Sequence, residues 1–152
     1  MLCKSDPIAA QAAISPERAL VIARQRFPDL SGDGIQVYPG AAPQPIHANQ
    51  VQTAMAFLKL LRPTKRPTIG SGTLKHDCES WGSVNGLTAY VSRGALTAAA
   101  IALGLSVRAY RNGPHVEIGV SSPHLRKVND VTLAARIELR GRRGQIPEQA
   151  SP

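Results

Sequence analysis

Four basic residues occupy a short stretch in the middle of the chain: Arg62, Lys65, Arg66 and Lys75. No acidic residue interrupts this stretch, and the first to follow it is Asp77. Pro63 and Pro67 are incompatible with a helix interior, so we expect the first three cations to stand on an extended segment. Cations without neighbouring acids suit a phosphate backbone, because Lys and Arg contacts to phosphates supply most non-specific nucleic-acid affinity. The stretch therefore predicts contacts with a polyanion.

A glycine-rich loop, PTIGSGTLKH, follows these cations. Gly70 and Gly72 could let successive backbone N–H groups turn toward an anion, with Lys75 and a helix N-terminus adding positive charge. The spacing matches neither a phosphate-binding P-loop nor a dinucleotide fingerprint. The alternative interpretation is an ordinary helix start without a ligand.

His76 and Cys78 raise the question of a metal site or a thiolate nucleophile. A zinc site needs further ligands, and the remaining candidates show no recognised spacing: Cys3, His47, His115 and His124. Two residues apart on a helix, His76 and Cys78 would face different directions. Cys78 instead shares helical register with Leu74 and Trp81, so we expect a buried, inert thiol. The chain shows no catalytic residues, no metal ligands and no cofactor motif, and we expect no enzyme.

Positive charge is concentrated in the second part of the chain, which includes Arg126, Lys127, Arg136 and Arg140. Residues 59–144 contain fourteen Lys and Arg against five Asp and Glu, a net charge of +9, whereas the rest of the chain carries −1. This asymmetry favours a polyanionic partner. The alternative is a set of solvated basic faces with no partner.

The chain of 152 residues is long enough for a hydrophobic core without disulfide or metal staples. Two cysteines make no disulfide framework, and the opening residues, MLCKSDPIAAQAAISP, do not resemble a secretory signal. The longest apolar run, residues 95–105, is too short for a bilayer, which needs about 20 residues. We expect a cytoplasmic protein with no membrane association.

Capping residues and apolar spacing predict four helices, over residues 16–27, 50–61, 73–83 and 93–103. The expected N-caps are Ser15, Asn49, Ser71 or Thr73, and Ser92. The last helix has no polar face and ends at Gly104, so we expect it to be buried all round. Alternating residues around Asn112-Gly113 then predict a hairpin over residues 105–121. A helix-turn-helix is disfavoured, because Gly113-Pro114 would end a recognition helix almost at once. The fold class is α+β: about four helices on a small antiparallel sheet of two or three strands.

Residues 124–140 are ambiguous between helix and strand. Val131, Leu133, Ala135, Ile137 and Leu139 alternate as in a strand, whereas LAARIELR is rich in strong helix formers. The alternation favours a strand that joins the hairpin. The expected organisation is an N-terminal helix and Pro/Gly-rich arm (1–48), a core unit (49–121), an appended basic segment (122–141) and a mobile tail (142–152).

The middle third of the chain resembles a group of short bacterial proteins without an assigned activity. The resemblance rests on a series of short matches: RPTK (62–65), LKH (74–76), Glu79 with Trp81, YVS (90–92), and Gly94-Ala95 before the Ala-rich run to Gly104. It implies that residues 59–121 form one unit, and it implies no site.

The sequence predicts a small basic accessory protein that binds DNA or RNA mainly through phosphate contacts, with an origin in a mobile element as one possibility. The alternative is a protein-binding inhibitor or adaptor without catalytic activity. Few aromatic residues are available for stacking on single-stranded bases.

Overall fold

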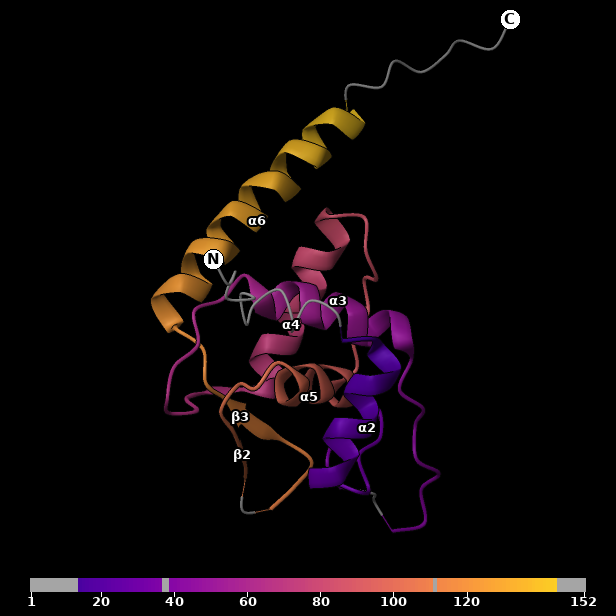
Figure 1. The fold of residues 1–152 in the computed structure, drawn as a ribbon. Coiled ribbons are helices and arrows are strands. Elements are labelled where there is room, and N and C mark those ends of the chain that lie inside the picture. The colour runs from indigo at the N-terminus through magenta and orange to yellow at the C-terminus, as the bar shows by residue number, and fades with distance from the viewer. Residues whose placement is uncertain (1–13, 37–38, 111, 145–152) are drawn as a thin grey trace, which may run out of the picture.

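The protein is an α+β fold in which three helices and a small sheet surround a central helix, and a long helix projects from one side (Figure 1). The computed structural model describes residues 14–36, 39–110 and 112–144. The described helices are α2 (Pro16–Arg26), α3 (Ala48–Lys59), α4 (Ser71–Val84), α5 (Arg93–Ala102) and α6 (Ser122–Gly144). The strands are β1 (Ile69–Gly70), β2 (Val107–Ala109) and β3 (Val116–Ile118).

Helix α5 is the centre of the fold, as its uniformly apolar composition predicted. Ser92 caps it by accepting a hydrogen bond of 3.1 Å from the Ala95 N–H. Gly104 follows the helix with φ at +74°, a backbone conformation that favours glycine. Helices α2, α3 and α4 all pack against α5. The central helix therefore has almost no face left for solvent.

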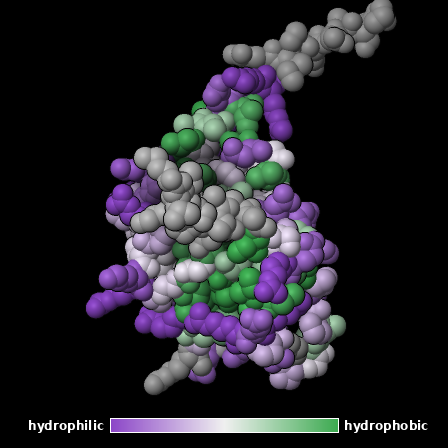
Figure 2. Space-filling model, viewed as in Figure 1, coloured by the Kyte–Doolittle hydropathy of each residue, from purple (hydrophilic) through white to green (hydrophobic). Residues whose placement is uncertain are grey.

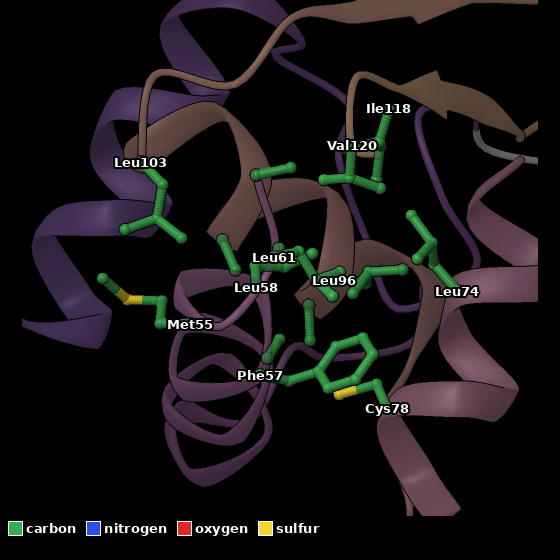
Figure 3. Close-up of a cluster of buried hydrophobic side chains, with 14 of the residues drawn as sticks. Met55, Phe57, Leu58, Leu61, Leu74, Cys78, Leu96, Leu103, Ile118 and Val120 are labelled. Carbon is green, nitrogen blue, oxygen red and sulfur yellow. The ribbon is translucent and has the colours of Figure 1, made fainter. Parts of the chain in front are cut away.

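The core lies where α3, α4 and α5 meet the sheet, and it is mainly aliphatic. Figure 3 shows Phe57, Leu58, Leu74 and Leu96 pointing into one cluster, with Ile118 lying above them on the sheet side. The Phe57 ring also lies 5.8 Å from the Trp81 ring, centroid to centroid. Helix α2 contributes Ala19 to the same cluster, so it shares this core.

The sheet confirms the predicted hairpin and adds a third strand. β2 and β3 pair antiparallel, with Val107 opposite Ile118 and Ala109 opposite Val116. The Tyr110 N–H donates to the His115 carbonyl at 3.2 Å, so backbone pairing continues beyond the end of β2. The strand order is β1-β3-β2, so the central strand is β3.

Residues 122–144 form helix α6, and the prediction of a strand was wrong. The alternating residues do not form one buried face, because Val131, Leu133, Ile137 and Leu139 are all exposed. The local preference of LAARIELR for helix prevails where no neighbouring strand rewards an extended chain. The helix also continues to Gly144, past the expected boundary at residue 141. Residues 145–152 of the expected tail lie outside the described residues.

The starts of α3 and α4 differ from the predicted caps. The N-cap of α3 is His47, two residues before Asn49, and neither it nor the N-cap of α4, Gly70, provides a side-chain cap. Ser71 lies inside α4, where its buried hydroxyl accepts a hydrogen bond of 3.2 Å from the Val116 N–H. None of the helices in the described ranges is long and apolar enough to cross a bilayer.

Candidate nucleic-acid interface

The extended segment 62–68 runs beside the chain that connects β3 to α6. Pro63 forms an isolated bridge with Val120, and the Thr64 N–H donates a hydrogen bond of 3.0 Å to the Gly119 carbonyl. Backbone pairing therefore holds the segment in place without its charged side chains. The side chains of Arg62, Lys65 and Arg66 are exposed, as predicted.

The same segment lies against the first turn of α6. The Ser121 N–H donates to the Arg62 carbonyl at 2.8 Å, and the Arg62 N–H donates to His124 Nδ1 at 2.9 Å. Ser121 caps the helix by accepting from the His124 N–H at 3.3 Å. These bonds bring Arg62 next to a helix that contains four other predicted site residues: Arg126, Lys127, Arg136 and Arg140.

Helix α6 carries a strong positive charge along its length of about 34 Å. It contains six Lys and Arg against Asp130 and Glu138, a net charge of +4. Arg142 pairs with Glu138. The other five cations are exposed and have no ion-pair partner among the described residues.

Three arginines of α6 gather near the C-terminal end of α4. Arg136, Arg140 and Arg143 recur at intervals of four and three residues, which places them on one side of the helix. Together with Leu139, they line a crevice of about 230 Å³ against Ser83 and Val84. Figure 2 shows the hydrophilic end of this projecting helix next to apolar side chains.

Lys75 does not join this surface. It forms an ion pair with Glu79, and its Nζ lies 4.6 Å from the centre of the Tyr90 ring. Glu79 also accepts a hydrogen bond from the Val91 N–H, so the pair connects α4 to the start of α5. The half-buried Lys75 side chain therefore differs from Arg62, Lys65 and Arg66, because it is already paired with an acid.

Gly70 and Gly72 do not form the expected concave anion loop. Gly70 is extended, with φ −66° and ψ 143°, and pairs with Glu117 in the sheet, while Gly72 lies in the first turn of α4. Burial and, to a lesser extent, the Arg93 charge lower the pKa of the nearby His115, which disfavours the charged form of its ring. The loop is the plain junction between β1 and α4.

Cys78 is fully buried, which confirms the sequence interpretation. Burial, with smaller contributions from nearby charges, raises the pKa of its thiol to about 12, so the reactive thiolate is scarce at neutral pH. No group of three or more His, Cys, Asp and Glu among the described residues is arranged to hold a metal ion. Cys3 lies outside the described residues.

Sequence reasoning missed Arg143 and the exposed apolar residues of α6. Both omissions have one cause, the assignment of a strand and a mobile tail to what is one helix. The signal was present in Glu138 and Arg142, whose spacing of four residues is typical of helix-stabilising pairs.

Comparisons with known proteins return no match to a family model, a curated protein or a solved structure. The resemblance of the middle third to a group of short bacterial proteins stays a prediction.

Proposed function

We propose that this protein binds nucleic acid through phosphate contacts, with segment 62–66 and helix α6 as the binding surface. One observation carries the proposal. Eight cations on these two adjacent segments are exposed and without an ion-pair partner in the described part of the chain. They are Arg62, Lys65, Arg66, Arg126, Lys127, Arg136, Arg140 and Arg143.

Unpaired like charges repel one another, so this surface is more favourable with a polyanion than without one. The guanidinium groups suit phosphates, because each can donate two parallel hydrogen bonds. This surface offers no aromatic ring for stacking, since segment 62–66 and α6 contain no Phe, Trp or Tyr. Contacts to a backbone therefore account for the surface better than stacking on single-stranded bases.

A salt titration tests the proposal directly. We expect the protein to bind a short fluorescent DNA duplex at about 50 mM salt and to lose affinity steeply by about 200 mM. If six or more of these cations contact phosphates, the loss over this range is roughly a thousandfold or more. Absence of binding at low salt, or binding that does not respond to salt, would contradict the proposal.

Paired charge reversals locate the surface. Arg66→Glu and Arg18→Glu change the net charge equally, and both side chains are exposed. Arg18, however, lies on α2, outside the proposed surface. We expect duplex affinity to fall several-fold more in Arg66→Glu than in Arg18→Glu. Equal losses would mean that only the overall charge of the protein matters.

The second candidate function is a protein-binding inhibitor or adaptor. It is favoured by Val131 of α6 and by Leu60, two exposed apolar side chains that line the same groove. Contiguous exposed apolar side chains are a common feature of protein interaction sites. Either role suits an accessory protein of a mobile element.

A further inference from the structure

An apolar groove separates α6 from the C-terminal ends of α3 and α4. Its volume is about 430 Å³, within the usual range of binding pockets. Its apolar lining consists of Leu60, Trp81, Val84, Val128, Val131 and Ala135. The first half of α6 packs on α4, and the groove runs along the side of that contact.

Two large apolar side chains in the walls of the groove are exposed to solvent. Leu60 is 43% exposed and Val131 is 71% exposed, although both line the same groove. Isolated exposed apolar residues need no explanation, but adjacent ones around a hollow indicate a surface that another molecule covers.

We propose that this groove binds an acidic amphipathic helix of a protein partner. Grooves between helices accept an amphipathic helix through apolar anchors three and four residues apart. No carboxylate lines the groove, whereas the cation Lys127 does. Two further cations belong to residues beside this lining: Arg62, whose backbone N–H donates to His124 Nδ1, and Lys59, which precedes Leu60. The chemistry therefore combines an apolar floor with a cationic edge.

The negative partial charges of the helix C-termini do not cancel the positive charge beside the groove. Helices α3 and α4 both end at the groove, and each C-terminus contributes about half a negative charge. Lys127 lines the groove, and Lys59 and Arg62 add two positive charges on residues next to its lining. The balance stays positive, and acidic side chains on the partner are favoured.

Charge also distinguishes the proposed occupant from two others. A second copy of the chain would place one α6, with its net charge of +4, beside another. A nucleic acid would gain little from the apolar walls, because phosphates need cations or hydrogen-bond donors. An acidic helix uses both features of the groove.

The sole tryptophan of the chain, Trp81, lines the groove and provides a reporter. The probe is a synthetic helical peptide with Leu at positions i, i+3, i+4 and i+7, Glu at most other positions, and no Trp or Tyr. We expect saturable binding that shifts Trp81 emission to shorter wavelength. A peptide with Lys in place of Glu should bind at least roughly tenfold more weakly, because it repels the rim.

Two matched variants test the location. Val131→Asp introduces a charge into the groove, whereas Ile137→Asp introduces the same charge on the same helix outside it. Both side chains are mostly exposed, so neither change should prevent folding. We expect Val131→Asp to weaken peptide binding at least roughly tenfold and Ile137→Asp to leave it within about twofold.

Other outcomes would overturn the proposal. No shift of Trp81 emission, equal effects of the two variants, or equal binding of the Lys peptide would each exclude an acidic helix in this groove. Sedimentation that shows a dimer dissociated by Val131→Asp would assign the groove to a second copy. Duplex DNA that competes with the peptide and loses affinity in Val131→Asp would assign it to nucleic acid. If the Val131→Asp variant still binds duplex DNA, the proposed phosphate surface is retained regardless of the result with the peptide.

Discussion

Cys78 illustrates how burial decides the behaviour of one residue. Its side chain belongs to the same core cluster as Phe57 (Figure 3), and it is fully buried. In a Cys3→Ser background, we expect Cys78 to react with a thiol reagent at least roughly a hundredfold more slowly in the folded protein than in urea. Rapid labelling under native conditions would show that the thiol is accessible and that the core assignment is wrong.

Asp77, the neighbour of Cys78, gives a prediction on pH. Burial raises the pKa of its carboxyl, and this effect outweighs the opposing hydrogen bond to Asn129 and the nearby His76. The folded state therefore binds a proton more readily than the unfolded chain, whose pKa is near 3.8. Charged Asp77 costs stability at neutral pH, and this cost disappears as the pH falls through the raised pKa.

We expect Asp77→Asn to be more stable than the unmodified protein at pH 7, with the difference shrinking toward pH 4. Urea unfolding of both proteins between pH 7 and pH 4 measures this difference in the free energy of unfolding. The comparison cancels the titration of other groups, such as His115. A difference that stays constant with pH would mean that the substitution acts through the Asn129 contact alone.

At the scale of elements, one glycine sets how closely α5 approaches the turn at residues 31–34. The Gly94 N–H donates to the Gly32 carbonyl at 3.3 Å, and a Cβ at Gly94 would lie 1.7 Å from the Ser31 carbonyl oxygen. The backbone of the turn must shift to admit a methyl group there. We expect Gly94→Ala to destabilise the protein by about 1–3 kcal/mol or more in urea unfolding.

Gly141, in the exposed part of α6, is the matched control. A Cβ there meets no atom within 4 Å, and Ala is the better helix former. Gly141→Ala should therefore stabilise the helix, by up to about 1 kcal/mol. Equal effects of the two substitutions would show that the contact between α5 and the turn does not restrict Gly94.

Across the whole molecule, the basic surface is separate from the interactions that hold the fold together. Arg62, Lys65 and Arg66 are exposed and have no acidic partner among the described residues, whereas Lys75 is paired. Reversing all three exposed charges to Glu should change the free energy of unfolding by no more than about 0.5 kcal/mol. The same triple variant should lose duplex binding, because three phosphate contacts become repulsive.

Circular dichroism of the triple variant during urea unfolding, together with duplex titration, separates the two effects. Unfolding of the variant would mean that these cations have structural partners. A folded variant with unchanged duplex affinity would mean that the segment is a solvated face and would remove the main support for nucleic-acid binding.

The elements that the sequence predicted correctly are those defined by neighbours along the chain. Ser92 and Gly104 bound α5 because a cap needs only the adjacent turn. The alternation on both sides of Asn112-Gly113 predicts the β2–β3 hairpin for the same reason. The exposure of Arg62, Lys65 and Arg66 also follows from local composition, since two prolines exclude a helix and no acid is nearby.

Tertiary structure decided the features that depend on distant partners. The Lys75–Glu79 pair is local to α4, but folding brings the Tyr90 ring to Lys75 and the Val91 N–H to Glu79. The groove exists only because α6 packs against α4. Leu60, which follows α3, stays exposed at its side. Local sequence determines conformational preference. The energy of a contact between distant residues becomes available only when folding brings both of them together. The surroundings of the basic and apolar residues of α6 therefore depend on how the helix packs.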